Sequence, residues 1–359
     1  MAKLKPGSTI GIFGGGQLGK MLCEAAQNIG FRTHIFDSHA KTPASQVSGA
    51  LTCAPYEDMA AIELFATSCD VITYEFENIP LPAIEQAKNF TNVFPPIKAL
   101  EISGDRLTEK TFLQNQVGAP VVEFANITSI EDMTLAIKEF GYPCILKTRR
   151  FGYDGKGQVK FTSHHDMKSG FSRLGEADII LEKYAPFVRE FSSVAARGQD
   201  GNIACYPLAE NVHKNHRLHT STAPANDPQN VKGKAQAITK RILEKLDYVG
   251  IIGIEFFELS GGEIIVNEIA PRVHNSGHWT MDANCTDQFE QHIRAITGLP
   301  LGEPTPNCQV VMTNLIGEDI FQKETLTAQP ETYVHDYGKT EVRADRKMGH
   351  VNRVIRSIW

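Results

Sequence analysis

Two apolar segments joined by Ser260-Gly261-Gly262 constrain the fold of this chain more than any other feature. Ile251 to Leu259 and Glu263 to Ile269 are strand-like, and two such segments around a glycine turn predict a β-hairpin. If the two glycines form a two-residue turn, counting outward places Glu255 opposite Glu268. Like charges in one cross-strand pair are destabilising unless a cation lies between them, and Mg²⁺ is commonly held by one or two carboxylates. We therefore expect these glutamates to bind Mg²⁺, the alternative being a solvated hairpin face on which both point into water.

A dense run of polar residues begins at the end of the second strand. Asn267 to Trp279 contains a carboxylate, a guanidinium, two imidazoles and two amides. So many different polar groups at the end of a strand predict a functional site. His274 and His278 could lie on one helix face, but the intervening Asn275-Ser276-Gly277 is typical of a loop. We therefore expect these histidines to hydrogen-bond a ligand and not to bind a metal.

Length, charge and cysteine spacing limit the class of protein. A chain of 359 residues exceeds what one hydrophobic core usually supports, so two or three domains are expected. A formal charge of -6 argues against a nucleic-acid-binding role. We find no apolar stretch long enough for a membrane span and no signal-peptide core, and we expect a cytoplasmic protein. The seven cysteines form no Cys-x-x-Cys pair, which predicts buried thiols without disulfides or zinc.

The N-terminal residues predict a βαβ unit. A strand over 8–13 is followed by Gly14-x-Gly16-x-x-Gly19, a helix, and a strand over 32–36 that ends at Asp37. This pattern matches the dinucleotide-binding fingerprint, although a glycine turn at a helix N-terminus can accept any phosphate or carboxylate. The acidic segment Glu75-Phe76-Glu77-Asn78 follows a further short strand. Such a position lies where open α/β sheets bind ligands.

A second glycine-rich segment, Gly152-Tyr153-Asp154-Gly155-Lys156-Gly157-Gln158, separates the predicted strand Cys144 to Lys147 from one that begins at Val159. The backbone N–H groups of such a loop can form an anion-binding concavity. It is not a Walker loop, because no Gly-Lys-Ser/Thr follows a four-residue spacer. The alternative is a flexible hairpin tip.

Two further patterns have weaker functional interpretations. His213-x-x-His216-x-x-His219 has metal-like spacing, but interleaved Lys214 and Arg217 oppose cation binding, so we expect no metal there. A basic patch near the C-terminus is either a solvated face or a phosphate-binding surface; it contains Lys339, Arg343, Arg346, Lys347 and His350.

Four of these features occur in a recognisable order. They are the glycine-turn domain, Asp105-Arg106-Leu107-Thr108-Glu109-Lys110, the Lys147 strand with its glycine loop, and Glu255 with Asn267-Glu268. Together they resemble the ATP-grasp superfamily. With Ala270 to Trp279 and Arg346 to His350 added, nearly the whole chain is similar to the family of N5-carboxyaminoimidazole ribonucleotide synthetases.

The resemblance implies a multidomain α/β and α+β protein with an ATP-grasp fold. It implies a Rossmann-like (pre-ATP-grasp) domain at 1–104, a central lid domain with the glycine loop at 105–184, and a C-terminal domain with the Mg²⁺ and substrate site at 185–359. The implied reaction of purine biosynthesis joins bicarbonate to the amino group of 5-aminoimidazole ribonucleotide through carboxyphosphate, converting ATP to ADP and phosphate. ATP and Mg²⁺ would be the cofactors, the partners would be small-molecule substrates without nucleic acid or membrane, and the enzyme would be a homodimer.

The family's site residues can be transferred position by position. Catalytic roles would belong to Arg272, Lys147, Tyr153, Asp154, Lys156 and His274. ATP would contact Arg106, Lys147, Gly152, Tyr153, Asp154, Gly155, Lys156, Gly157, Gln158, Glu182, Lys183, Tyr184, Ala185, Glu190, His213, Asn267 and Glu268. Bicarbonate and the ribonucleotide would contact Gln17, Leu18, Glu75, Arg272, His274, Asn275, Ser276, Lys339 and Arg346. Mg²⁺ would be held by Glu255 and Glu268.

Three other functions stay open at this stage. An NAD-dependent dehydrogenase would explain the first glycine turn and Asp37, but neither the glutamate pair nor the second glycine loop. Another ATP-grasp ligase, such as a formate-dependent glycinamide ribonucleotide transformylase, would share the nucleotide residues and differ at Arg272 to His278. A nucleotide-binding regulator would not need so many acids and bases at one site.

Overall fold

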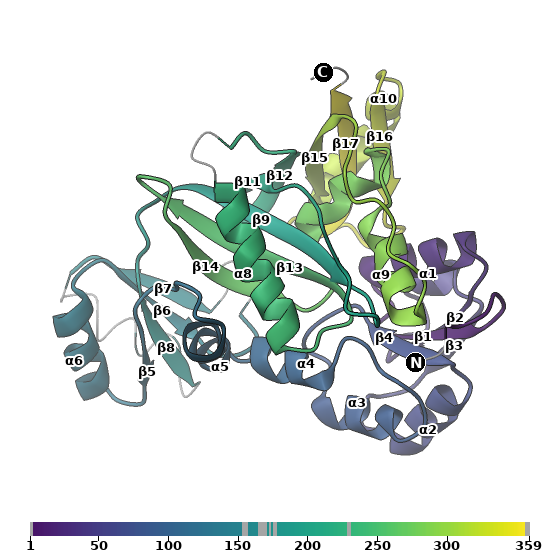
Figure 1. Ribbon diagram of the computed structural model, residues 1–359, viewed down its shortest axis with the longest axis horizontal. Helices are drawn as coiled ribbons and strands as arrows, with labels where there is room; N and C mark the ends of the chain where they lie inside the picture. The colour runs from purple at the N-terminus through teal and green to yellow at the C-terminus, as the bar shows by residue number, and fades with distance from the viewer. Residues whose placement is uncertain are drawn as a thin grey trace.

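Three β-sheets organise the chain (Figure 1). The computed structural model describes residues 3–152, 157–163, 171, 174, 178–227 and 231–355. Two sheets have four strands and the third has nine. The first is parallel and the other two are antiparallel wherever strand pairs are described, so the predicted mixture of α/β and α+β architecture is confirmed.

The first sheet has the strand order β3-β2-β1-β4 and carries the predicted βαβ start. Its strands are β1 (Thr9–Phe13), β2 (Arg32–Asp37), β3 (Ala50–Cys53) and β4 (Val71–Tyr74). The helices are α1 (Gln17–Asn28), α2 (Met59–Thr67), α3 (Leu81–Lys88) and α4 (Ile97–Ser103), with a 3-10 turn η1 (Ala44–Gln46). Strand β4 is buried at every position, as expected for a parallel strand with both faces covered.

The second sheet has the order β5-β8-β6-β7. Its strands are β5 (Phe124–Ile127), β6 (Cys144–Thr148), β7 (Gln158–Phe161) and β8 (Ile179–Lys183). Helix α6 (Ile130–Phe140) buries Met133, Ile137 and Phe140 against it. Helix α5 (Arg106–Phe112) precedes this sheet and continues into a π-helical turn, η2 (Leu113–Val117). The side chain of Asp105 accepts hydrogen bonds from Leu107 N and Thr108 N, and this cap fixes the start of α5.

The third sheet has the path β14-β13-β9-β11-β12-β15-β17-β16, with β10 paired to β9. Its strands are β9 (Phe187–Arg197), β10 (Ile203–Cys205), β11 (Ala209–Lys214), β12 (Arg217–Ala223), β13 (Gly250–Leu259), β14 (Ile264–Ala270), β15 (Gln309–Ile316), β16 (Thr332–Asp336) and β17 (Lys347–Ile355). The helical elements are α8 (Val231–Lys245), η4 (Asn275–Asp282), α9 (Gln288–Thr297), η5 (Gly317–Gln322) and α10 (Lys323–Thr327). Helix α8 covers β9, β13 and β14 (Figure 1). Helix α9 shares a hydrophobic core with α1, which joins this sheet to the first domain.

The hairpin between β13 and β14 differs from the predicted one at its tip. Leu259 N donates to the carbonyl oxygen of Glu263 at 2.8 Å, so the loop contains three residues, Ser260-Gly261-Gly262, and not two. Gly261 and Gly262 have φ values of +92° and +76°, a region that glycine enters without a Cβ clash. The predicted two-residue turn is therefore wrong.

The predicted pairing of Glu255 with Glu268 is nevertheless confirmed. The register shifts between Glu255 and Phe256, where β14 contains one extra residue, Asn267. This β-bulge compensates for the longer loop. It also turns Asn267 toward the same side as the two glutamates, because its Nδ2 lies 3.3 Å from Glu255 Oε2.

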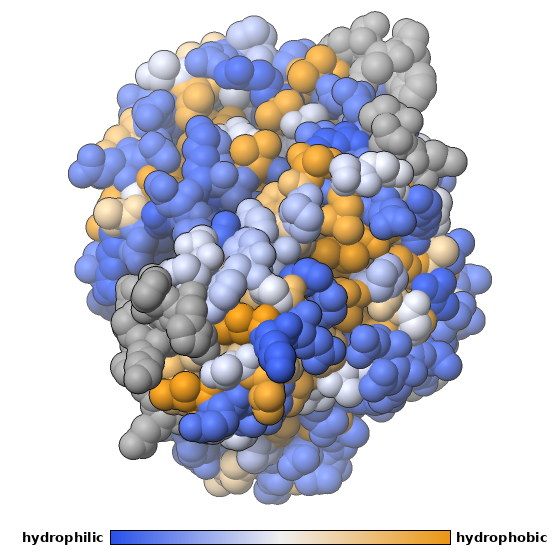
Figure 2. Space-filling view, turned by 90° about the vertical axis from the view of Figure 1, so that its left-hand side faces the viewer, coloured by the Kyte–Doolittle hydropathy of each residue, from blue (hydrophilic) through white to orange (hydrophobic). Residues whose placement is uncertain are grey.

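Hydrophilic side chains cover most of the face seen in Figure 2, with hydrophobic residues in smaller patches between them. All seven cysteines are free thiols, as predicted, and Cys23, Cys69, Cys144 and Cys308 are buried. Cys53 is exposed, contrary to the prediction, because it ends the edge strand β3. In the described ranges we find no helix with the length and apolarity needed to cross a membrane.

Candidate active site

A cavity of about 760 Å³ is lined by residues from all three sheets. The first sheet contributes residues after β1 and β4, the second contributes residues of β6, β7 and β8, and the third contributes residues of β9, β11, β12, β13, β14 and β17. Most predicted site residues line it: Gln17, Leu18, Glu75, Arg106, Lys147, Gly152, Gln158, Glu182, Lys183, Tyr184, Ala185, Glu190, His213, Glu255, Asn267, Glu268, Arg272, His274 and Asn275. Sequence positions more than 250 residues apart therefore form one site.

One end of the cavity gathers cations around a buried carboxylate. Glu182 Oε2 lies 2.6 Å from Lys147 Nζ, and its Oε1 lies 3.6 Å from Lys110 Nζ. Burial acts to raise the pKa of Glu182, but the charges of Lys110 and Lys147 outweigh it and lower the pKa to about 2. Arg106 contributes a third cation, with Nη1 3.2 Å from Glu268 Oε2. This excess of positive charge suits phosphate groups.

Lys110 was not among the predicted site residues. It follows Arg106 by four positions on α5, so both side chains lie on one face of the helix. Its ammonium group is almost fully buried and also donates to the carbonyl oxygen of Asn267 at 3.2 Å. The sequence signal that could have identified Lys110 was its i, i+4 spacing from Arg106.

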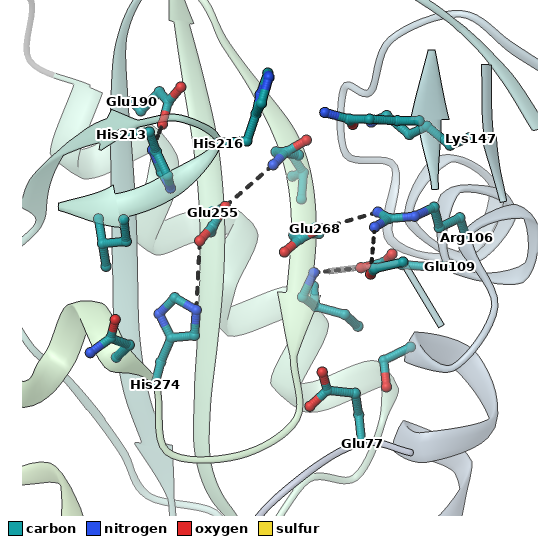
Figure 3. Close-up of a pocket in the computed structure, with 18 of the residues that line it drawn as sticks. Glu77, Arg106, Glu109, Lys147, Glu190, His213, His216, Glu255, Glu268 and His274 are labelled. Atoms are coloured by element: carbon teal, nitrogen blue, oxygen red, sulfur yellow. Dashed lines mark hydrogen bonds and ion pairs between the residues drawn. The ribbon is translucent and has the colours of Figure 1, made fainter. Parts of the chain in front are cut away.

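The glutamate pair lies beside this cation cluster (Figure 3). Burial, followed by the charge of Glu268, raises the pKa of Glu255 to about 7. Two facing carboxylates and the adjacent Asn267 amide form an oxygen-rich group that fits Mg²⁺, which takes its remaining ligands from phosphates and water. The described residues contain no cluster of three or more metal-binding side chains. In the structure Arg106 pairs with Glu268, and the Nε2 atom of His274 lies 3.6 Å from Glu255 Oε1.

Glu109 is a second residue that the sequence did not assign. Its buried carboxyl group accepts a hydrogen bond from Ile269 N, directly after Glu268 (Figure 3). Burial and the Glu268 charge raise the pKa of Glu109 to about 8. The contact ties helix α5 to strand β14 and fixes the backbone on which Glu268 sits.

The other end of the cavity contains Arg272 and His274. Arg272 pairs with Glu77 of the first domain, with Nη2 3.2 Å from Glu77 Oε1. His274 Nδ1 lies 2.7 Å from Ser276 Oγ, so Ser276, which does not line the cavity, acts on the site through His274. Burial and the Arg272 charge lower the pKa of His274 to about 3, so the ring is neutral near pH 7. Asn275 exchanges two amide hydrogen bonds with Asn314, at 2.8 and 3.0 Å.

The first glycine turn binds carboxylates of this chain. Gly15 N donates to Asp37 Oδ2 at 2.7 Å, and Gly19 N donates to Glu75 Oε2 at 2.7 Å. Gly16 N donates to the other oxygen of Glu75, and a Cβ on Gly16 would lie 2.6 Å from that oxygen. The donors that a dinucleotide phosphate would need are thus already used. This geometry argues against the dehydrogenase alternative.

The three histidines with metal-like spacing differ in their contacts with the cavity. His213 forms an ion pair with Glu190, and hydrogen bonding to that carboxylate raises the His213 pKa against the effect of burial. His216 lies at the β11–β12 turn and also lines the cavity, whereas His219 does not.

Comparisons with known proteins agree with this geometry. Residues 7–104 match the family model of the ribonucleotide synthetase preATP-grasp domain, residues 112–289 match the ATP-grasp domain, and residues 310–358 match the phosphoribosylaminoimidazole carboxylase C-terminal domain. An N5-carboxyaminoimidazole ribonucleotide synthase of Brucella melitensis is 47% identical over 98% of this chain and 97% of its own length. The chain belongs to the N5-carboxyaminoimidazole ribonucleotide synthase family.

Other members of the family support this placement. The enzyme of that name from Staphylococcus aureus is 39% identical, over 97% of this chain and 93% of its own length. A crystal structure of an ADP complex of N5-carboxyaminoimidazole ribonucleotide synthetase superposes with a TM-score of 0.94 at 41% identity, covering 100% of this chain and 95% of the other. The Aspergillus clavatus synthase, solved with ADP and 5-aminoimidazole ribonucleotide, gives 0.90 at 26% identity, covering 98% and 95%. The predicted ATP-grasp fold with a pre-ATP-grasp domain is confirmed, and the chain is an ATP-grasp ligase of this family.

Some of the family residues predicted for this chain do not line the cavity. Gly157, Lys339 and Arg346 lie outside its lining, as Ser276 does. Lys339 Nζ donates to Lys347 O at 2.7 Å, and burial together with the charge of Arg346 lowers its pKa to about 8. The predictions for Tyr153, Asp154, Gly155 and Lys156 lie outside the described residues.

The predicted basic patch is partly wrong. His350 is fully buried, with its ring stacked on His335 at 4.4 Å, because β17 lies between β15 and β16. Arg343 is exposed and pairs with Glu341. Lys347 lines the cavity, so this lysine is the member of the patch in contact with the site.

Proposed function

We propose that this chain joins bicarbonate to the amino group of 5-aminoimidazole ribonucleotide, forms N5-carboxyaminoimidazole ribonucleotide, and cleaves ATP to ADP and phosphate. One observation carries the proposal: a single cavity contains both the cation cluster around Glu182 and the Arg272–His274 group. A phosphate-activating half-site and an oxyanion-binding half-site would therefore share one cavity.

At the nucleotide end, Arg106 and Lys147 would contact the phosphates. Lys147 suits this role because Glu182 holds its ammonium group at 2.6 Å. Glu182 to Ala185 would border the adenine, Glu190 the ribose, and His213 the nucleotide edge. The roles of Gly152 to Gln158 as a loop over the phosphates stay predictions.

Glu255 and Glu268 would hold Mg²⁺, with Asn267 beside them. When bound there, Mg²⁺ supplies positive charge to phosphate oxygens. The cross-strand pairing supports the assignment, because each carboxylate faces a like charge that a cation would relieve.

The chemistry would proceed in two displacements. A bicarbonate oxygen attacks the γ-phosphorus of ATP, the bond to ADP breaks, and carboxyphosphate forms. The substrate amine then attacks the carboxyl carbon, phosphate leaves, and the nitrogen loses a proton. Lys147 and Arg106 stabilise charge on the transferring phosphoryl group, and Arg272 holds the bicarbonate oxygens in line.

The ribonucleotide would lie toward Gln17, Leu18 and Glu75, which belong to the first domain and line the same cavity. His274, Asn275 and Ser276 would orient the reacting groups. The domain boundaries at 104/105 and 184/185, the homodimer and the cytoplasmic location stay predictions.

The test is ADP release measured with ATP, Mg²⁺ and 5-aminoimidazole ribonucleotide, with and without bicarbonate. We expect release to require both cosubstrates and the product to carry the label of ¹⁴C-bicarbonate. A parallel reaction with formate and glycinamide ribonucleotide tests the other ATP-grasp chemistry. Turnover in that reaction alone would refute the proposed substrate.

A further inference from the structure

Glu77 is a pocket-lining carboxylate to which neither the sequence nor the proposed mechanism gives a role. It follows β4 in the acidic segment that begins at Glu75. It lines the cavity beside Arg272, to which it is hydrogen-bonded. Both side chains are largely buried, with exposed fractions of 28% for Glu77 and 19% for Arg272. The pair joins the first domain to the segment that follows β14.

The hydrogen-bond pattern of Arg272 is specific. Its Nε and Nη2 both donate to the Glu77 carboxylate, which is the two-point geometry of a guanidinium–carboxylate pair. Its Nη1 donates to the carbonyl oxygen of Val273 at 3.2 Å. A guanidinium has five N–H donors, one on Nε and two on each terminal nitrogen. After these three contacts, one hydrogen remains on Nη1 and one on Nη2.

The two remaining hydrogens belong to the two terminal nitrogens, and a planar oxyanion can accept from both. Glu77 prevents rotation of the guanidinium, because turning the group would break two charge-assisted hydrogen bonds at once. Burial acts to raise the pKa of Glu77, but the Arg272 charge lowers it below its ordinary value, so the carboxylate stays ionised near pH 7.

We propose that Glu77 is a positioning residue for bicarbonate, which holds Arg272 by its Nε–Nη2 edge so that the terminal nitrogens present their remaining hydrogens to the anion. This inference rests on the proposed function, since it assigns bicarbonate to Arg272. Glu77 acts through Arg272 and does not itself touch the reacting atoms.

The test is steady-state kinetics of a Glu77→Gln variant, with the bicarbonate and ATP concentrations varied separately. We expect the KM for bicarbonate to rise on the order of 10- to 100-fold, because a loosened guanidinium loses its orientation toward the anion. The KM for ATP should change less than about twofold, because its contacts lie at the other end of the cavity. Glu290→Gln is the matched control, since it removes a glutamate from an Arg pair on α9 outside the cavity lining.

A double-mutant cycle separates positioning from a structural role. In an Arg272→Lys background, Glu77→Gln should raise the bicarbonate KM no further, because the group that Glu77 orients is already gone. An unchanged bicarbonate KM in Glu77→Gln, or an effect that adds fully in the Arg272→Lys background, would overturn the proposal. Failure of the proposed function would appear differently, as a wild-type enzyme whose ADP release ignores bicarbonate.

Discussion

Replacing Lys110 with methionine removes one of the two ammonium groups that neutralise the buried Glu182 carboxylate. The side chains of Lys110 and Glu182 are 2% and 4% exposed, so water screens their attraction very little. At 3.6 Å and an effective dielectric constant of about 20, the gross attraction is about 4–5 kcal/mol. Methionine fills a similar volume and also removes the cost of burying the ammonium group.

The expected net loss is about 3 kcal/mol. Removing one partner of a buried pair typically costs about 3–5 kcal/mol, and Glu182 keeps Lys147 at 2.6 Å, so the lower end applies. Lys110→Met should also raise the KM for ATP, because the variant loses the hydrogen bond to the carbonyl oxygen of Asn267 beside Glu268.

The measurement is the free energy of unfolding from urea titration, followed by far-ultraviolet circular dichroism. Lys323→Met is the matched control: its pair with Asp336 spans 3.0 Å but is 52% and 37% exposed, so the expected loss is below about 1 kcal/mol. If Lys110→Met lost no more than this control, the buried network would not contribute as argued.

Three further predictions follow from the same geometry. Glu268→Gln should reduce ADP release on the order of 100-fold or more and leave the circular dichroism spectrum unchanged; near-normal turnover would remove Glu268 from the metal site. ATP with Mg²⁺ at about 100 times its Kd should stabilise the wild type by about 2.7 kcal/mol, measured as a rise in Tm that Glu268→Gln diminishes; equal rises in both proteins would contradict the assignment. Burial lowers the pKa of His292 to about 3, below the 6.5 of an exposed histidine, so the unfolded chain binds this proton more readily and stability should fall as pH drops from about 6.5 toward 3. This residue can change the free energy of unfolding by at most about 1.4 kcal/mol per pH unit. If the free energy of unfolding of His292→Gln kept the full pH dependence of the wild type, other groups would be responsible for it.

The glutamate pair illustrates how far sequence reasoning reaches. Pairing of Glu255 with Glu268 was predicted correctly, yet the assumed two-residue turn was wrong and a bulge at Asn267 restored the count. A bulge has no strong sequence signature, because the extra residue is accommodated by the partner strand and by packing. The bulge brings the side chain of Asn267 to the site. The family resemblance predicted Asn267 as a site residue, whereas the register argument did not.

The glycine turn shows a different limit. Local sequence predicted an anion at the N-terminus of α1, and the anion is Glu75, 56 residues after Gly19. Which carboxylate reaches the turn depends on β4 lying beside β1, a tertiary contact that local pattern does not contain. Glu109 was missed for the same reason, and the spacing of Lys110 from Arg106 was only a weak signal, since the packing of α5 against β14 is what brings both side chains to the site.

The segment from Glu268 to Arg272 contains residues that we propose for both half-reactions. Glu268 ends the glutamate pair on β14 and Arg272 follows four residues later, so their Cα atoms lie at most about 14 Å apart in an extended chain. Helix α5 fixes the first position through Glu109, and the first domain fixes the second through Glu77. An intermediate formed between a phosphate held near Glu268 and an oxyanion held by Arg272 would therefore already lie where the amine must attack. Because the two anchors come from different elements, a change in either should uncouple ATP cleavage from carboxylation, which the ratio of ADP released to ¹⁴C incorporated would measure.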